Sequence, residues 1–351
     1  MQIWRGLKEI PADVAGAGTA ITIGNFDGVH TGHAAVLAAT VRAARERGVM
    51  AVAITFDPHP ARIHRPEGAP VLLTGLTDRL DLLAAAGLDA CLVIHYTPAF
   101  AAQSAVAFAR TYLRDGLGAR AVVVGEDIRF GAGNEGDRGT MAELGGELGF
   151  EVGIVTDVPA DGSHRRASST WVRELLAAGA VADARRILGR WHRMRGVVVH
   201  GQARGRDLGF PTANLAPDAS GTIPADGVYA GWLTTDWGSG TAERMPAAIS
   251  IGTNPTFSGM ARVVEAHVLG RTDLELYGRE IVVEFVARLR PTLKFDGIDE
   301  LIARMNTDVD QAADLLGVPR PSVRPSIQPI QPSNQPTQPS IQPTQPRANR
   351  A

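Results

Sequence analysis

Short apolar runs alternate with stretches of helical periodicity through the first half of the chain. The apolar runs predict strands at residues 20–24, 50–56, 90–95 and 121–125. Helical spacing predicts a long helix at residues 31–47, with Thr31 as its N-cap and Gly48 at its end. Further helices are predicted at residues 77–86, 101–113, 141–148, 169–178 and 181–188. Strands that alternate with helices favour a parallel sheet covered on both faces, so this half is predicted to be an α/β domain.

The pattern changes after Gly189. Strand-like runs follow one another at residues 197–199, 227–233, 247–251, 262–269 and 281–289, with Gly and Pro between them. One helix is predicted at residues 297–316. Consecutive strands followed by a single helix favour a closed or nearly closed antiparallel β-barrel with a C-terminal helix. We therefore expect an α/β domain at residues 1–188 and a barrel domain at residues 189–318.

Residues 319–351 form a third kind of sequence, rich in Gln and Pro. From Gln328 the pattern Gln-Pro-x-Gln-Pro-x-x repeats, and proline every few residues excludes a helix. With no aromatic residues, this tail has too little apolar surface to offset chain entropy, so it is predicted to be disordered and partly polyproline-like. Two interpretations stay open for it: an extension without function, and a docking segment for another protein.

The composition narrows the class of protein. The chain has 351 residues and a net charge of −2, which provides no broad positive field for nucleic acid or an anionic membrane. The first residues are polar and mixed in charge, unlike a signal peptide, and no apolar run approaches the ~20 residues of a membrane span. The single cysteine, Cys91, lies in an apolar run, which predicts a buried thiol. These features predict a cytoplasmic protein and leave its oligomeric state open.

A loop rich in Gly and His joins the first predicted strand to the first long helix. It reads Gly24-Asn25-Phe26-Asp27-Gly28-Val29-His30-Thr31-Gly32-His33. Glycines let the main chain approach a phosphate, and the N–H groups at a helix start favour an anion. Two histidines three residues apart, as imidazolium or as neutral donors, can stabilise charge that develops on a phosphorus atom. The loop therefore predicts a site for phosphate chemistry.

These residues resemble the signature of the nucleotidyltransferases, and a Rossmann-like sheet is what that resemblance implies. The segment Arg166 to Arg173, with Ser-Ser-Thr opening a helix, is similar to the second signature of the same superfamily. The resemblance implies that His30 and His33 act on the reacting phosphates. It also implies an ATP- and phosphate-binding role for Gly24, Phe26, Asp27, Gly28, Arg166, Ser169, Thr170 and Arg173.

Two further segments are similar to those that distinguish flavin adenylyltransferases within the superfamily. They are Thr55 to Pro60 and Gly125 to Gly131, and they imply flavin-binding roles for His59 and Asp127. Ile128 stands where the family often has an aromatic residue. An FMN phosphate is already anionic, so adenylylation requires alignment and charge neutralisation rather than a base.

The second half contains Gly- and Arg-rich residues 201–209 followed by Pro211-Thr212-Ala213-Asn214. On an extended segment Thr212 and Asn214 face the same way, and their oxygens are hard ligands suited to Mg²⁺. The pattern Gly-x-x-x-x-Gly-Lys-Ser/Thr of ordinary phosphate-loop kinases does not occur. The motif instead resembles riboflavin kinase, which implies that Thr212 and Asn214 hold Mg²⁺ with ATP. Gly205 and Arg206 then belong to the loop that covers the nucleotide.

Other segments of the riboflavin kinase pattern follow in order across residues 195–312. Within them, Glu265 matches the family's catalytic glutamate and Asn254 a flavin-binding residue. A riboflavin hydroxyl, unlike an FMN phosphate, needs a base to accept its proton. In sum, the chain resembles the bifunctional bacterial riboflavin kinase/FAD synthetase family, which implies ATP, riboflavin and FMN as ligands. Two alternatives remain: an enzyme with one decayed site, and a flavin-binding sensor protein.

Overall fold

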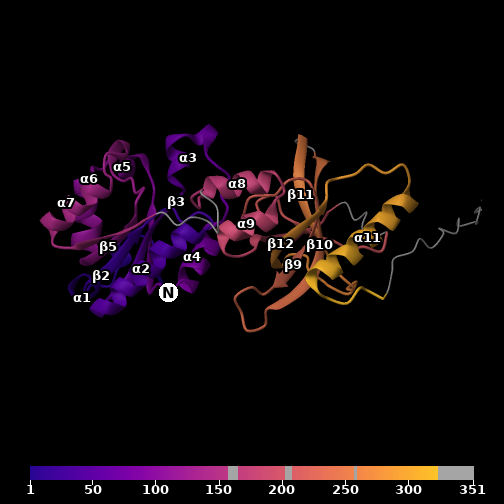
Figure 1. The fold of residues 1–351 in the computed structure, drawn as a ribbon, viewed down its shortest axis with the longest axis horizontal. Coiled ribbons are helices and arrows are strands. Elements are labelled where there is room, and N and C mark those ends of the chain that lie inside the picture. The colour runs from indigo at the N-terminus through magenta and orange to yellow at the C-terminus, as the bar shows by residue number, and fades with distance from the viewer. Residues whose placement is uncertain (157–164, 202–207, 257–258, 323–351) are drawn as a thin grey trace, which may run out of the picture.

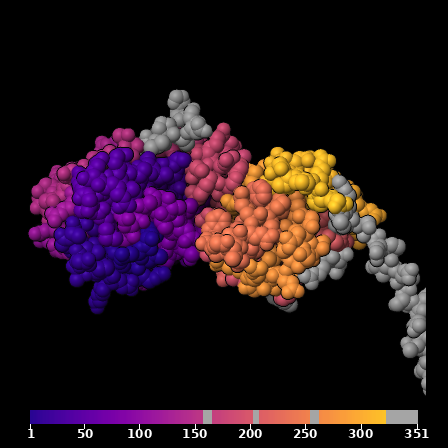
Figure 2. Space-filling view, turned by 90° about the horizontal axis from the view of Figure 1, so that it is seen from below, coloured from indigo at the N-terminus to yellow at the C-terminus, as the bar shows by residue number. Residues whose placement is uncertain are grey.

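The chain folds into two lobes that lie side by side, an α/β lobe from the first half and a β-barrel lobe from the second (Figure 1, Figure 2). This computed structural model describes residues 1–156, 165–201, 208–256 and 259–322. Most of the Gln/Pro-rich tail, from residue 323 onward, lies outside the described residues. The predicted order of α/β fold, antiparallel barrel and C-terminal helix is confirmed.

The first lobe contains a six-stranded, wholly parallel sheet of order β1-β4-β3-β2-β5-β6. Strand β2 lies between β3 and β5. The chain runs from β2 to β3 and β4 on one side and then crosses to β5 on the other side, so the strand order reverses between β2 and β5. Ligands of such sheets bind at the carboxyl ends of the strands beside this reversal. Its strands are β1 (Gln2–Trp4), β2 (Thr19–Ile23), β3 (Met50–Asp57), β4 (Ala90–His95), β5 (Ala119–Gly125) and β6 (Glu151–Val155).

Alternate side chains of the strands enter two separate cores, as the period of a strand requires. From β2, Ala20 packs on one face with Leu37, while Ile21 and Ile23 pack on the other. Both faces are therefore covered, and all five residues of β2 are buried. Cys91 lies in the first of these cores, where burial raises the pKa of its thiol to about 12, so the predicted buried thiol is confirmed.

The helices predicted for this lobe are present with two differences, and the short helices at residues 14–17 and 60–64 were not predicted. Residues 101–113 do not form one helix: a short helix ends at Ala101, and a second begins after its own cap, Ser104. The N-cap of the long helix is His30, not Thr31. The helices are α1 (Val14–Ala17), α2 (Thr31–Arg47), α3 (Pro60–His64), α4 (Leu76–Ala85), α5 (Pro98–Ala101), α6 (Ala105–Phe108), the π-helical η3 (Ala109–Gly116) and α7 (Arg138–Leu148), with 3-10 turns η1 (Leu7–Glu9), η2 (Pro66–Gly68) and η4 (Ala132–Asn134).

The second lobe is a closed antiparallel barrel of strand order β10-β11-β8-β7-β12-β9. Helix α11 (Ile298–Leu316) packs on its outside, where Ile302 and Val309 contact Phe210 and Leu269 in one core (Figure 1). The strands are β7 (His192–Val199), β8 (Ala213–Leu215), β9 (Gly227–Thr235), β10 (Glu243–Thr256), β11 (Gly259–Val268) and β12 (Glu280–Arg290).

Helices α8 (Ser169–Ala177) and α9 (Val181–Leu188) lie between the lobes and share a core with the barrel (Figure 1). Val172 and Leu176 of α8 belong to the same buried cluster as Tyr229 and Phe285 of the barrel strands. Leu73, which precedes α4 in the first lobe, joins this cluster as well. The seam between the lobes is therefore a packed apolar core.

A buried ion pair crosses the same seam. Asp78 on α4 accepts two hydrogen bonds from the Arg193 guanidinium on β7, each 3.1 Å long. Only 2% of the Asp78 side chain and 8% of the Arg193 side chain are exposed. Removal of either partner alone would leave an unpaired charge inside the protein and would strongly destabilise the fold.

Candidate active sites

The loop between β2 and α2 has an unusual backbone. Phe26 and Val29 have φ values of 48° and 37°, and Gly28 has a φ of 80°. Residues other than glycine rarely adopt this left-handed backbone region, and for a β-branched residue such as Val29 the backbone is strained by about 1–3 kcal/mol. Such strain persists only where surrounding contacts hold the loop, and it is typical of functional sites.

The amide groups of this loop do not all face one way. The Gly28 N–H donates to the Thr74 hydroxyl at 3.0 Å, and the Val29 N–H donates to the Phe26 carbonyl. In the described part of the chain, the Thr31 and Gly32 N–H groups have no partner. The N–H groups at the positive end of α2 that remain free for an anion are therefore those of its first turn. In the loop itself some N–H groups are already bonded, so only part of the predicted phosphate site is available there.

His30 and His33 are stacked, with ring centroids 3.7 Å apart. His30 caps α2: its Nδ1 atom accepts the His33 backbone N–H at 3.3 Å. Burial, then the nearby positive charges of Arg166 and Arg190, lower the pKa of His30 to about 4. Burial, followed by the charges of His30 and Arg190, also lowers the pKa of His33 well below its ordinary value. Both rings are therefore neutral at pH 7, and of the two forms considered from the sequence, the structure favours neutral donors over imidazolium.

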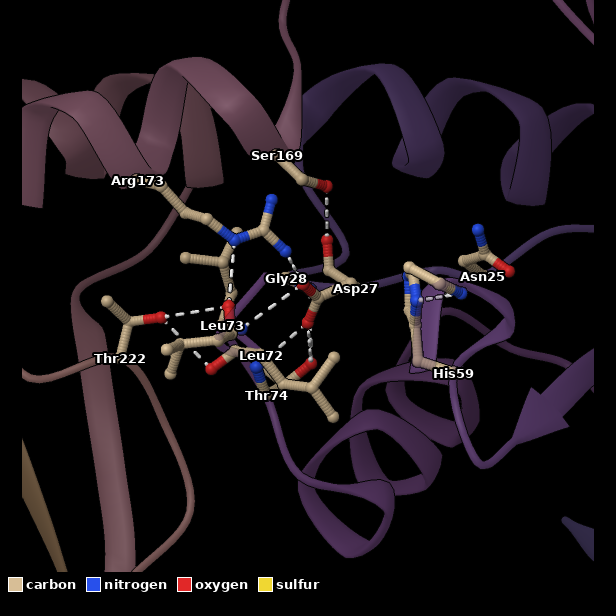
Figure 3. Close-up of polar contacts among 12 residues, drawn as sticks. Asn25, Asp27, Gly28, His59, Leu72, Leu73, Thr74, Ser169, Arg173 and Thr222 are labelled. Atoms are coloured by element: carbon tan, nitrogen blue, oxygen red, sulfur yellow. Dashed lines mark hydrogen bonds and ion pairs between the residues drawn. The ribbon is translucent and has the colours of Figure 1, made fainter. Parts of the chain in front are cut away.

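The start of α8 lies against this loop from the other side (Figure 3). The Ser168 hydroxyl caps α8, and the Ser169 hydroxyl donates to the Asp27 carbonyl at 2.8 Å. Arg173, one turn further along, donates to the Val71 carbonyl at 2.8 Å and forms an ion pair with Asp27. The second signature is thus joined to the first by direct contacts.

The Asp27 carboxylate lies inside the protein (Figure 3). Its oxygens accept the N–H groups of Leu73 and Thr74 at 3.2 and 3.0 Å, in addition to the contact with Arg173. An anionic group with these partners organises the loop. A direct phosphate contact for Asp27 stays a prediction, and the side-chain oxygens are already bonded elsewhere.

A cavity of about 540 Å³ opens where the strand order reverses. The Arg166 guanidinium and the Asp127 carboxylate form an ion pair of 2.9 Å at its wall. Burial lowers the pKa of His59, whose Nδ1 atom accepts the Ala61 N–H at the start of α3. Many of the predicted site residues line this cavity together: Gly24, Phe26, Asp27, His30, His33, His59, Asp127, Arg166, Ser169, Thr170 and Arg173.

The far part of the cavity is aromatic, which the sequence did not reveal. Phe56 and Tyr96 meet edge to face with centroids 5.5 Å apart, and Tyr96 meets Phe100 at 5.3 Å. Phe108 and Phe130 also line the space. These residues come from separate strands, helices and loops, so no single stretch of sequence contains the pattern. The cavity therefore has a polar end, with the histidines, and an apolar end.

The predicted residues of the second site also meet, in the barrel. Glu265 on β11 lies opposite Asn214 on β8 in the strand register. The Thr212 hydroxyl donates to the Glu265 carboxylate at 3.3 Å, and the Asn214 amide lies 3.3 Å from the same hydroxyl. Burial raises the pKa of Glu265 above its ordinary value, against the smaller opposing effect of the Thr212 hydrogen bond. Three side chains with oxygen donors therefore converge at one point.

The backbone of Gly201 closes one side of this cluster. A Cβ atom at Gly201 would lie 2.6 Å from the Asn214 side chain, so any larger residue would require that side chain to move. A small cavity of about 40 Å³ opens beside Thr212, bordered by Arg271 and Tyr277. Gly205 and Arg206 lie outside the described residues, and Asn254 is placed only as part of the backbone of β10.

Two arginines bind carbonyl groups of the loop between β2 and α2, residues 24–30, which we call the phosphate loop. Neither arginine was predicted as a site residue. Arg79 on α4 donates to the Asn25 carbonyl at 2.8 Å, and Arg190, directly after α9, donates to the carbonyls of Gly28 and Val29. Nothing in the local sequence around either arginine signals this contact, because the partners lie 54 and 162 positions away.

Two family models match the chain: FAD synthetase over residues 13–171 and riboflavin kinase over residues 188–316. The bifunctional riboflavin kinase/FMN adenylyltransferase of Escherichia coli K12 is 36% identical over 323 residues, 92% of this chain and all of the relative. The protein of the same name from Bacillus subtilis is 30% identical, over 84% of this chain and 92% of the relative. A crystal structure described as a macrolide-efflux protein from Streptococcus pneumoniae has the same fold, with a TM-score of 0.76 and 27% identity over 89% of this chain and 98% of the other.

Among the described residues, no helix has the length and apolar character needed to cross a membrane. The same residues contain no group of three or more His, Cys, Asp or Glu side chains that could hold a metal ion.

Proposed function

The chain belongs to the family of bifunctional riboflavin kinase/FMN adenylyltransferases, and on that premise we propose how its two sites divide the chemistry. It is an enzyme that phosphorylates riboflavin to FMN and adenylylates FMN to FAD. We assign adenylylation to residues 1–188 and phosphorylation to residues 189–318. The observation that carries this assignment is that each family model coincides with one of the two residue clusters: the histidine pair falls in the first and Glu265 in the second.

In the adenylyltransferase, an FMN phosphate oxygen attacks the α-phosphorus of ATP. A new P–O bond forms, and the bond to the β-phosphate breaks to release pyrophosphate. The Nδ1 atom of neutral His30 accepts a hydrogen bond, so its proton is on Nε2, which can donate to a phosphate oxygen. His33 adds a buried Nδ1 atom with no partner among the described residues. We assign both histidines to the reacting phosphates and Arg166, Ser169 and Thr170 to the leaving pyrophosphate.

The two ends of the cavity suit the two parts of FMN. Its volume lies within the ~300–1,000 Å³ typical of small-molecule sites. The aromatic end, with Phe56, Tyr96 and Phe100, supports binding of the flat flavin ring, and His59 and Asp127 line the space as polar partners. Gly24 and the backbone of the following loop then face the nucleotide.

In the kinase, the hydroxyl of riboflavin attacks the γ-phosphorus of ATP and must lose its proton. Glu265 is the base in this proposal, because it lies beside Thr212 and Asn214 and burial raises its pKa, which makes its carboxylate a better proton acceptor than that of an exposed glutamate. The Thr212 hydroxyl orients its carboxylate. Gly205 and Arg206 are assigned to ATP and Asn254 to the flavin on the resemblance alone.

Mg²⁺ with ATP fits the same cluster. The hydroxyl of Thr212 and the amide oxygen of Asn214 are hard donors within one small group of side chains. These two residues would hold the ion, which neutralises phosphate charge when it is bound. Two protein ligands are consistent with the usual mode of Mg²⁺, which retains several waters and binds substrate phosphates.

A cytoplasmic location is also part of the proposal. It rests on the single, buried cysteine, which suits a reducing compartment.

The test is to incubate the enzyme with riboflavin and Mg-ATP and to separate the flavins by chromatography. We expect FMN to form first and FAD to follow. A chain with one decayed site would stop at FMN, or would make FAD only from supplied FMN, and a sensor protein would leave riboflavin unchanged. Omitting Mg²⁺ is expected to abolish both steps, and phosphorylation of riboflavin without a divalent ion would contradict the assigned role of Thr212 and Asn214.

A further inference from the structure

Arg190 lies in the segment that joins α9 to the first barrel strand, within the residues matched by the riboflavin kinase model. Its guanidinium nevertheless contacts the other site. One nitrogen, Nη1, donates to the Val29 carbonyl at 3.0 Å and to the Leu188 carbonyl at 3.1 Å. The other, Nη2, donates to the Gly28 carbonyl at 2.5 Å. A planar guanidinium is suited to such a set of fixed acceptors, because its donors have a rigid geometry.

We propose that Arg190 is a positioning residue for FMN adenylylation, which acts by holding the strained phosphate loop from beneath. This inference rests on the proposed function of that loop. The two loop carbonyls it binds belong to Gly28 and Val29, the two residues that immediately precede His30 and that both have positive φ. Arg190 therefore fixes the peptide groups that set the direction in which His30 enters α2.

A second guanidinium holds the other end of the same loop. Arg79, with 1% of its surface exposed, donates to the Asn25 carbonyl, which also accepts a hydrogen bond from the Thr55 hydroxyl. The loop carbonyls are thus bound to buried donors, and the side chains of His30 and His33 are left on the cavity side. Arg79 belongs to the first lobe, so it holds the loop to its own sheet. Arg190 is the residue that ties the loop to the interlobe segment.

The positive charge of Arg190, like its hydrogen bonds, helps to keep His30 in its capping position. After burial, which is the main cause, this positive charge contributes to the lowered pKa values of His30 and His33. It thereby disfavours a second proton on either ring and preserves the neutral form in which His30 Nδ1 can cap the helix. The guanidinium itself stays charged, because burial lowers its own pKa only to about 10.

The test compares Arg190→Gln and Arg190→Lys with a control on the same helix end, Arg186→Gln. Arg186 is 61% exposed, and its ion pair is with Asp183 on the surface. For each full-length protein, riboflavin phosphorylation and FMN adenylylation are measured separately, with the melting temperature. Because an error of about 1 Å in placing reacting groups can cost about 10²-fold, we expect Arg190→Gln to lower kcat for adenylylation about 10- to 100-fold. The KM for FMN should change little, since the loop acts on the reacting phosphates.

Arg190→Lys retains a charged donor and is expected to recover part of the lost kcat, and Arg186→Gln should match the wild type. Riboflavin phosphorylation in the same molecules should be unchanged. Adenylylation at the wild-type rate in Arg190→Gln would overturn the proposal. So would an equal loss of both activities in both Arg190 variants, which would mean that the residue serves only the fold. If the wild-type protein itself makes no FAD from FMN, the proposed function fails and not this inference alone.

Discussion

Glu265→Gln is the most direct test of the kinase chemistry. Gln is nearly the same size as Glu and keeps an oxygen that can accept the Thr212 hydroxyl, which lies 3.3 Å away in the wild-type protein. The pairing of β11 with β8 at this position involves backbone groups and is not altered. The substitution therefore removes the ability to accept a proton while the local structure is retained.

The expected loss follows from the role. A positioned general base contributes about 10²–10⁴-fold, which corresponds to about 3–5 kcal/mol of transition-state stabilisation. We expect kcat for riboflavin phosphorylation to fall by this factor with little change in KM. Glu265 must be ionised to act, and burial raises its pKa. The wild-type rate should therefore fall on acidification at a higher pH than the pKa of an ordinary glutamate, and that acidic limb should be missing in the variant.

The assay is steady-state conversion of riboflavin to FMN across pH, with adenylylation of supplied FMN as the internal control. Glu280→Gln is the matched variant, because Glu280 is a half-exposed glutamate on a barrel strand. It should leave both activities unchanged. Phosphorylation within a few-fold of wild type by Glu265→Gln would refute the assignment of the base. A parallel fall in adenylylation would indicate that the substitution disturbs the whole fold.

Three other predictions concern the first site, the seam and the tail. Replacing His30 and His33 by Ala should lower FAD formation about 10²–10³-fold per lost donor, so that FMN accumulates from riboflavin in a chromatographic assay; normal FAD formation would exclude the pair from the reaction. Asp78→Asn should lower the free energy of unfolding in urea by about 3–5 kcal/mol, whereas Asp81→Asn, which changes a half-exposed carboxylate paired with Arg195, should change it by less than about 1 kcal/mol; equal effects would contradict a buried pair. A chain ending at Ser322 should keep both activities, and loss of either would assign the tail a catalytic role.

Much of the fold follows from local sequence. The runs that predict strands at residues 50–56 and 90–95 correspond to β3 and β4, and the helix predicted at residues 31–47 has the bounds of α2. Strands β1, β6 and β8 were not predicted. Two of these have only three residues, too few for a pattern, and β6 has an apolar run, Val152 to Val155, that is short and contains a glycine. Their partners in the sheet or barrel, rather than their own sequence, hold them extended.

The site residues, like the strands, divide into those that the sequence indicates and those that only the fold brings together. The spacing of His30 and His33 in a Gly-rich loop singled out those two residues, whereas Glu265 was named from the resemblance to riboflavin kinase. The aromatic end of the cavity and the two arginines beneath the loop were missed, since each depends on residues that only the tertiary fold brings together. The side chain of Asp27 illustrates the limit most clearly. Its place in the motif gives no sign that its buried carboxylate binds the backbone of residues 73–74, and its contact with phosphate stays a prediction.

That contact also explains how the two lobes become one enzyme. Asp27 binds the N–H of Leu73, whose side chain belongs to the core shared by α8, α9 and the barrel. The Thr222 hydroxyl, just before the barrel strand β9, donates to the Leu72 carbonyl at 3.0 Å (Figure 3). The phosphate loop is therefore attached to the barrel through residues 71–74 as well as through Arg190.

Helix α8 provides a further physical connection between the phosphate loop and the barrel lobe. Its first residue, Ser169, binds the phosphate loop, while Val172 and Leu176 are buried with the barrel. A helix of nine residues cannot keep Ser169 in place if the core around its other residues is lost. The residues assigned to the leaving pyrophosphate are thus positioned by the packing of the second lobe. The second lobe thus supports the adenylylation site through this shared core, whereas the described residues of the kinase cluster, Thr212, Asn214 and Glu265, all lie in the barrel lobe.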